Sequence, residues 1–163
     1  MADGNVEGLT ALTAANAVDT DLIYIWDIGE SGIARSKKMT VGEVRKLGGE
    51  VLMIAISDET TDLTTGTAKT TFRMPYAMTL SEVRASVTTA GTTGTTIFDI
   101  NDGGTSIMTT NKLDILTTAT IDDGTATLTD TALADKAIIT IDIDAVSTTA
   151  PKGAKIYLIG TRT

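Results

Sequence analysis

The stretch Ile139-Thr140-Ile141-Asp142-Ile143-Asp144 decides the fold of this chain. Its apolar residues recur at every second position, and side chains alternate between the two faces of a β-strand with the same period. The isoleucines therefore share one face and the polar residues share the other. An α-helix would scatter the same isoleucines around its circumference. The stretch predicts a strand with one face in a core and one face in solvent, as in antiparallel sheets.

Segments of similar character recur from residue 51 onward at intervals of roughly eight to twelve residues, with Gly-rich and Asp-rich turns between them. This spacing is typical of an antiparallel β-sandwich or barrel, and we expect a mainly β protein with a jelly-roll-like sandwich. Within 78–87 the apolar alternation slips once, which predicts a β-bulge. The last segment is more continuously apolar and would suit a central strand or a subunit contact. The expected strands are 51–56, 69–74, 78–87, 95–100, 105–108, 113–116, 125–128, 137–145 and 155–161.

Threonine divides the chain into two parts. Only four of its 33 threonines lie in residues 1–59, and the other 29 lie in residues 60–163. Threonine favours strands, and its hydroxyl is well solvated on an exposed sheet face, so this enrichment fits a β-sandwich. We therefore expect an N-terminal module at residues 1–50 and a Thr-rich sandwich at residues 51–163.

The N-terminal module is predicted to be a β-hairpin followed by a short helix. The segments 21–28 and 33–39 are rich in strand-forming residues and are separated by a Gly-containing turn. Thr40 is the expected N-cap of the helix, because Glu43 lies three residues later and completes a capping box. A unit of about forty residues is only marginally stable on its own, so this module would normally need a partner surface to cover it.

Composition excludes several classes of function. The chain has no cysteine and no histidine, which removes disulfides, thiolate or imidazole metal sites and the Ser-His-Asp triad. A net charge of −8 and a pI near 4.4 argue against nucleic-acid binding. Residues 1–7 lack the features of a signal peptide, and no apolar run is long enough to span a membrane. We expect a soluble protein, and only carboxylate, Lys or Tyr chemistry remains open to an enzyme of this composition.

Acidic residues offer the few arrangements that could carry chemistry. Asp142 and Asp144 share one strand face and could form the acid pair of a glycosidase. The two acids of such a pair usually come from different elements, so a solvated strand face is the preferred interpretation. The segment 99–104 lacks the EF-hand pattern and is expected to be a hairpin turn. A calcium ion at Asp122 and Asp123 is left open. Gly91-Thr92-Thr93-Gly94 has no following lysine and is not a phosphate loop.

The N-terminal module carries the candidate contact residues. The only basic cluster in the sequence is Arg35-Ser36-Lys37-Lys38. It either docks on an acidic neighbour or prevents edge-to-edge strand pairing at the hairpin. Two aromatic residues on one side of the first strand either anchor a partner or cover the short helix. Both alternatives stay open here. The candidate partner-contact residues are Leu22, Tyr24, Trp26, Arg35, Lys37 and Lys38.

Several of these segments, taken in order, resemble known virion proteins. The segments 8–14 (GLTALTA), 26–28 (WDI) and 36–40 (SKKMT) resemble the N-terminal module of many tailed-bacteriophage virion proteins, including fibre and decoration proteins. The second part is similar to a Thr-rich β-sandwich of phage structural proteins. Its matching segments are 71–80 (TFRMPYAMTL), 98–105 (FDINDGGT), 139–145 (ITIDIDA) and 158–160 (LIG).

The resemblance implies a non-enzymatic, homotrimeric structural protein of the virion, made in the host cytoplasm, without cofactor, metal or small-molecule substrate. Its implied partners are the major capsid protein or other virion proteins. A capsid decoration (cement) protein is favoured, because the sequence ends directly after the last expected strand and contains no long repeat shaft. A short tail fibre or head fibre is the alternative. The N-terminal module is the expected anchor.

Two functions of other classes were weighed against this one. A carbohydrate-binding sandwich would display several aromatic residues, but the chain has only six, and most occupy positions expected in the core. A carboxylate-based hydrolase would need two facing acids in a cleft. Glycan binding, or loss of activity on replacing Asp142 or Asp144, would identify these alternatives.

Overall fold

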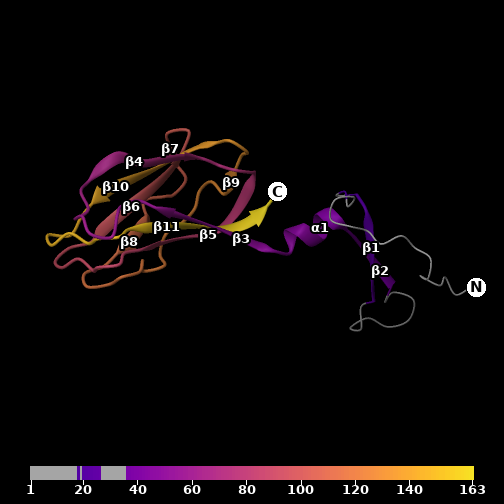
Figure 1. Ribbon diagram of the computed structural model, residues 1–163, viewed down its shortest axis with the longest axis horizontal. Helices are drawn as coiled ribbons and strands as arrows, with labels where there is room; N and C mark the ends of the chain where they lie inside the picture. The colour runs from indigo at the N-terminus through magenta and orange to yellow at the C-terminus, as the bar shows by residue number, and fades with distance from the viewer. Residues whose placement is uncertain (1–17, 19, 27–35) are drawn as a thin grey trace, which may run out of the picture. The chain divides into compact units, whose positions relative to one another are not determined.

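The computed structural model describes residues 18, 20–26 and 36–163. The chain divides into two compact units, one ending at Gly48 and one beginning at Gly49. The two units are described separately, with the element labels of Figure 1.

The first unit pairs two short strands and continues into a helix. Strand β1 (Leu22–Trp26) is antiparallel to β2 (Ser36–Thr40), and helix α1 (Val41–Lys46) follows directly. Thr40 Oγ1 accepts a hydrogen bond from the backbone N–H of Glu43 at 3.1 Å, and the Glu43 carboxylate accepts one from the Thr40 N–H at 2.6 Å. The predicted capping box is therefore confirmed. The expected turn between the strands lies outside the described residues.

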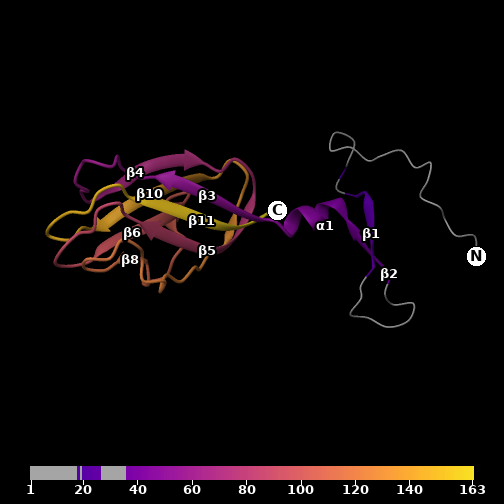
Figure 2. The ribbon, with the colours of Figure 1, turned by 60° about the horizontal axis from the view of Figure 1, so that its bottom comes forward.

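The second unit consists of two antiparallel sheets (Figures 1 and 2). One sheet has the order β3 (Gly49–Ala55), β11 (Lys155–Arg162), β5 (Met78–Ser86) and β9 (Ala132–Leu133). The other has the order β4 (Gly66–Arg73), β10 (Ile138–Ala145), β6 (Thr96–Asp102) and β7 (Thr105–Ser106), and β8 (Leu113–Ile115) also pairs with β6. The predicted mainly β, antiparallel fold is confirmed.

The chain crosses repeatedly between the two sheets. Strands β3, β5, β9 and β11 belong to one sheet, and β4, β6, β7, β8 and β10 belong to the other, so the chain changes sheet at every connection except those joining β6, β7 and β8. Because each crossing brings the chain to the opposite layer, the two sheets can pack as a sandwich around one core. An eight-stranded jelly roll built from two Greek keys needs such crossings, but the jelly roll itself stays a prediction.

The core lies between the sheets, where strand alternation places it. Ile139, Ile141 and Ile143 on β10 are fully buried, whereas Asp144 is exposed, as the opening stretch predicts. Strand β11, predicted to be central or a subunit contact, is central in its sheet between β3 and β5. Both sheets supply side chains to a single apolar cluster, whose fully buried members include Met74, Met78, Phe98, Ile100, Ile107, Leu113, Leu133, Ile156 and Leu158.

The predicted slip in β5 is a β-bulge at Ser81. Ile159 of β11 lies opposite Glu82, while the next residue, Gly160, lies opposite Leu80, so Ser81 is the extra residue. The bulge lets Leu80 and Val83 both face the core although they are three positions apart, an odd spacing that regular alternation would place on opposite faces. The sequence pattern therefore located an irregularity as well as a strand.

One predicted strand is wrong and one short strand was missed. The segment 125–128 forms no strand, because its backbone makes irregular hydrogen bonds to residues 107–111, and only Leu128 forms an isolated bridge, with Met108. Strand β9 pairs with β5 over only two residues, which is too short to produce a periodic signal.

Gly160 allows close backbone contact beside the bulge, which makes a stability prediction possible. A Cβ at this position would overlap the carbonyl oxygen of Thr79 and lie 2.9 Å from the Cα of Leu80. We expect Gly160→Ala to lower the free energy of unfolding by about 2–3 kcal/mol, because the backbone of a central strand pair must move. The measurement is urea denaturation followed by circular dichroism.

Gly49→Ala is the matched control for this variant. A Cβ at Gly49 meets no atom within 4 Å, and the residue also lies in a strand next to β11. We expect this control to stay within about 0.5 kcal/mol of the wild type. Equal effects of the two variants would contradict the assignment of close contact at Gly160.

Candidate functional site

The structure places five of the six predicted contact residues on the ribbon formed by β1 and β2. Leu22 pairs with Thr40, Tyr24 with Lys38 and Trp26 with Ser36, whereas Lys37 pairs with Ile25. Positions 22, 24, 26 and 38 therefore belong to one side of the ribbon, and position 37 belongs to the other. Arg35 lies outside the described residues.

Apolar side chains of the first unit remain uncovered. Leu22 is 48% exposed, and Ile23, which alternation directs to the opposite side of the strand, is also exposed. Val44 and Leu47 at the helix are exposed as well. A two-stranded ribbon is marginally stable in water unless a face is covered, and each side of this ribbon carries an exposed apolar side chain that a partner could cover.

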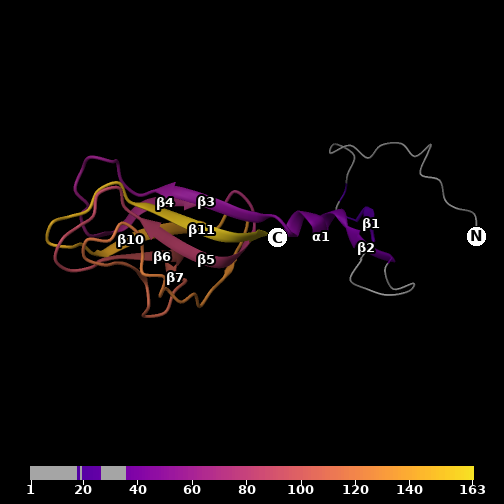
Figure 3. The same ribbon diagram turned by 90° about the horizontal axis from the view of Figure 1, so that it is seen from below.

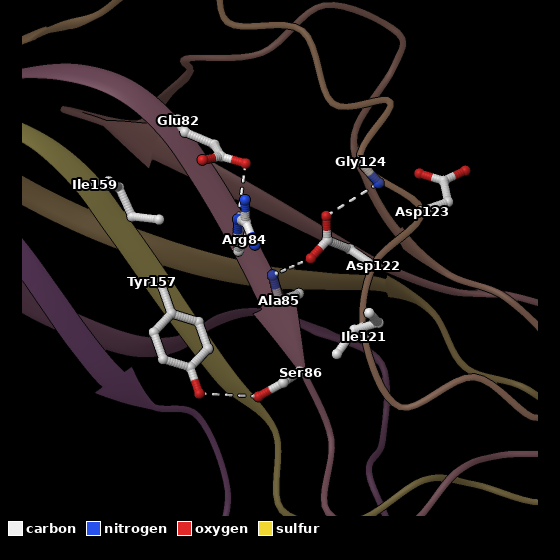
Figure 4. Close-up of a pocket in the computed structure, with 10 residues that line it drawn as sticks. All are labelled: Glu82, Arg84, Ala85, Ser86, Ile121, Asp122, Asp123, Gly124, Tyr157 and Ile159. Atoms are coloured by element: carbon white, nitrogen blue, oxygen red, sulfur yellow. Dashed lines mark hydrogen bonds and ion pairs between the residues drawn. The ribbon is translucent and has the colours of Figure 1, made fainter.

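The sandwich carries an open groove on the outer face of the sheet that contains β11 and β5 (Figure 4). Its volume is about 510 Å³. Strand β5 contributes Glu82, Arg84 and Ser86, strand β11 contributes Tyr157 and Ile159, and the remaining wall is the loop 121–124. Tyr157 and Ser86 form a hydrogen bond through their hydroxyl groups at 3.2 Å.

The groove has an apolar floor and a charged rim that includes one ion pair. The Tyr157 ring, Ile159 and the exposed Ile121 provide apolar surface, while Arg84 Nε pairs with Glu82 Oε1 at 2.7 Å. Of the lining residues, Tyr157 is the one aromatic residue, so the groove lacks the array of rings expected of a carbohydrate platform.

Asp122 is a structural residue of this groove. Its carboxylate accepts hydrogen bonds from the backbone N–H of Ala85 at 2.8 Å and of Gly124 at 3.2 Å, and its own N–H donates to the Ala85 carbonyl at 3.1 Å. Asp123 accepts hydrogen bonds from the backbone and the hydroxyl of Thr125. The two carboxylates thus stabilise the loop, and no cluster of three or more acidic residues that could hold a metal occurs in the part of the chain that the structure describes.

Lys112 links strands β6 and β10 on the outer face of the other sheet. Its Nζ lies 2.6 Å from a carboxylate oxygen of Asp99 on β6 and 2.6 Å from one of Asp144 on β10. Ser106 of β7 donates a hydrogen bond to the second oxygen of Asp99 at 2.6 Å. Burial by itself would lower the pKa of Lys112, but the hydrogen bonds and charges of Asp144 and Asp99 outweigh burial and raise this pKa.

These contacts assign structural roles to the aspartates that could have been catalytic. Asp142 accepts a hydrogen bond from the backbone N–H of Ala68 at 2.7 Å, where β4 departs from regular pairing, and Asp144 pairs with Lys112. Neither carboxylate faces the other across a cleft, since both project from one strand. Asp99 lies on β6 rather than in a metal-binding loop.

The sequence indicated the hairpin surface but not the other two features. Glu82, Arg84 and Tyr157 occupy outward positions of predicted strands, so alternation placed them on the surface without showing that a loop would close a groove over them. No sequence pattern indicated the ion pairs of Lys112, because its two partners are 13 and 32 residues away in sequence.

Comparison of the chain with protein families, with curated proteins and with solved structures finds no match. Within residues 18, 20–26 and 36–163, no helix combines the length and the apolar character needed to cross a membrane. Assignment of function therefore depends on the surfaces described above.

The Lys112 cluster leads to a prediction about stability. Lys112→Met leaves the buried Asp99 without its cation, and we expect the free energy of unfolding to fall by about 2 kcal/mol, less than for a fully buried pair because Lys112 is partly solvated. Lys136→Met is the control, because Lys136 is exposed beside Asp135, and its effect should stay below about 0.5 kcal/mol. Urea denaturation at pH 7 measures both.

The same pair of proteins tests the pH dependence. Because the folded-state pKa of Lys112 is raised above 10.5, its contribution to stability is complete below pH 10.5 and is lost as pH rises through the folded-state value. The difference between wild type and Lys112→Met should therefore be constant from pH 7 to pH 10 and shrink at higher pH. A difference that grows with alkalinity would contradict this assignment.

Proposed function

We propose that this chain is a structural protein of a tailed-bacteriophage virion, and most specifically a capsid decoration (cement) protein that binds and stabilises the assembled head. The observation that carries the proposal is the uncovered apolar surface of the first unit, where Leu22, Ile23, Val44 and Leu47 are all exposed. A partner surface that covers these side chains would complete the small unit.

The contrast between the two units supports different roles for them, one in attachment and one in display. The sandwich has its own apolar core, contributed by both sheets, and can be displayed outward. The first unit, whose described residues include the exposed Leu22, Ile23, Val44 and Leu47, is the proposed anchor. Its basic residues Arg35, Lys37 and Lys38 are proposed to contact acidic groups of the particle. Its proposed partners are the major capsid protein or other virion proteins.

Self-association is part of the proposal, with a homotrimer as the assembly. A repeated particle surface favours symmetric oligomers, because several weak anchors that bind together gain in effective concentration. No nucleic acid, membrane or small-molecule substrate enters the proposed role.

Copy number distinguishes the decoration protein from its alternative. Quantitative mass spectrometry of purified virions of the encoding phage should find the chain in proportion to the major capsid protein. A few copies per particle, located at the tail, would overturn the decoration role in favour of a short tail fibre or head fibre. Absence from the virion would overturn the proposal altogether.

A point variant tests the anchor directly. We expect Leu22→Asp to reduce binding to heads at least tenfold, because the introduced charge must be desolvated at the interface. Leu116→Asp is the matched control, since Leu116 of the sandwich has the same 48% exposure as Leu22. Cosedimentation with heads that lack the chain measures both, and equal losses would contradict the role of the first unit.

A further inference from the structure

Strand β3 forms an open edge of the sandwich. It is the outermost strand of its sheet, and its seven residues pair without interruption with β11, from Ala55 opposite Lys155 to Gly49 opposite Thr161 (Figure 3). Within the described part of the chain, no backbone hydrogen bond connects residues 49–55 to any segment other than β11. One side of β3 is therefore available for pairing.

The backbone groups on this free side can be assigned. The N–H of Ile56 donates to the carbonyl of Ala154 at 2.8 Å, so residue 56 directs its backbone toward the neighbouring chain segment. Backbone direction alternates along an antiparallel strand, and even-numbered residues of β3 therefore bond to β11. The N–H and C=O groups of the odd-numbered residues point away from it. These residues are Gly49, Val51, Met53 and Ala55.

The other sheet edges are short or irregular. Strands β7 and β9 have two residues each, and β8 has three. Strand β4 breaks register with β10 near Gly66, where Ala68 has a positive φ of 49°, and it carries the charged residues Lys69 and Arg73. Natural proteins protect edges in these ways, and β3 has only Glu50 as a charge.

We propose that β3 pairs antiparallel with β3 of a second copy of this chain, around a two-fold axis at Leu52. In this register Gly49 lies opposite Ala55 of the second copy, and Val51 lies opposite its Met53. Each such pair can exchange two hydrogen bonds, so all backbone groups on the free side of both strands are satisfied. The two four-stranded sheets then form one continuous sheet.

The side chains of β3 favour a second copy as the occupant. Val51 and Met53 are 56% and 61% exposed on the outer face. In the proposed register, Val51 of each copy packs against Met53 of the other copy across the axis. Glu50, which accepts a hydrogen bond from Tyr76 Oη at 3.2 Å, lies opposite Ile54 of the second copy. The register therefore brings no like charges together and extends the apolar floor formed by Tyr157 and Ile159.

The pairing is expected to be reversible. A contact along one seven-residue strand covers less than the standard interface of about 1,600 Å², so dimerisation should depend on concentration. The contact is independent of the proposed role in the virion. If the chain also forms trimers, edge pairing joins two trimers into a six-chain species.

Cysteine cross-linking tests the register, because the chain has no cysteine of its own. Opposed residues of a non-hydrogen-bonded pair have Cα atoms about 4.5 Å apart, which is within the range for a disulfide. With oxidised glutathione as the oxidant, Leu52→Cys should form a covalent dimer on non-reducing gels. Ile54→Cys is the control, since its two copies would be about 14 Å apart.

We expect at least tenfold more covalent dimer from Leu52→Cys than from Ile54→Cys, with circular dichroism spectra unchanged for both. Equal cross-linking, or none from Leu52→Cys at millimolar concentration, would overturn the proposal. No cross-linking from Leu52→Cys would leave a strand of another protein as the alternative occupant of the β3 edge. Neither result affects the copy number in virions, so failure here is distinguishable from failure of the proposed function.

A second pair of variants tests the contact without cysteine. Met53→Lys places a charge at the proposed interface, and sedimentation equilibrium should show the dimer dissociation constant raised at least tenfold. Ile121→Lys changes a residue of similar exposure, 66%, that lies on the loop beside β5 and away from β3. Equal effects of the two substitutions on dimerisation would contradict pairing through β3.

Discussion

Burial of the inward faces of β10 and β11 is the constraint on which the rest of the structure depends. Each strand is central in its sheet, and each presents fully buried residues at every second position, such as Ile141 and Leu158. Every other long strand pairs with one of these two. Because a shift of one residue would turn a whole apolar face into solvent, the two central strands determine the register of their neighbours.

The same two-residue period explains how much could be predicted from the sequence. It identified the core face of β10 and the bulge at Ser81, because each depends on side chains within one segment. The continuous apolar character of β11 allowed a central strand or a subunit contact, and the structure shows the central position. The capping box at Thr40 was also predictable, since both partners lie within one helical turn. For the candidate site, the sequence indicated Leu22 as a contact residue of the hairpin, and the structure finds it exposed.

Features formed by segments distant in sequence could not be predicted. Lys112 contacts Asp99 and Asp144 only because the fold brings β6 and β10 together. The groove beside β5 requires the loop 121–124, whose position depends on Asp122 rather than on any periodic pattern. The free edge of β3 likewise follows from the strand order, which the strand pattern alone does not specify.

Asp122 has a consequence for resistance to aggregation. Strand β9 covers β5 only opposite Met78 and Thr79, and farther along β5 the Asp122 carboxylate and backbone occupy the hydrogen-bonding groups of Ala85. A loop that lies 37 residues away in sequence therefore replaces a strand as the cover of this edge. Local opening of the loop would expose unpaired strand backbone while the core remained folded. The resistance of the protein to aggregation then depends on how rarely this loop opens, as well as on its global stability.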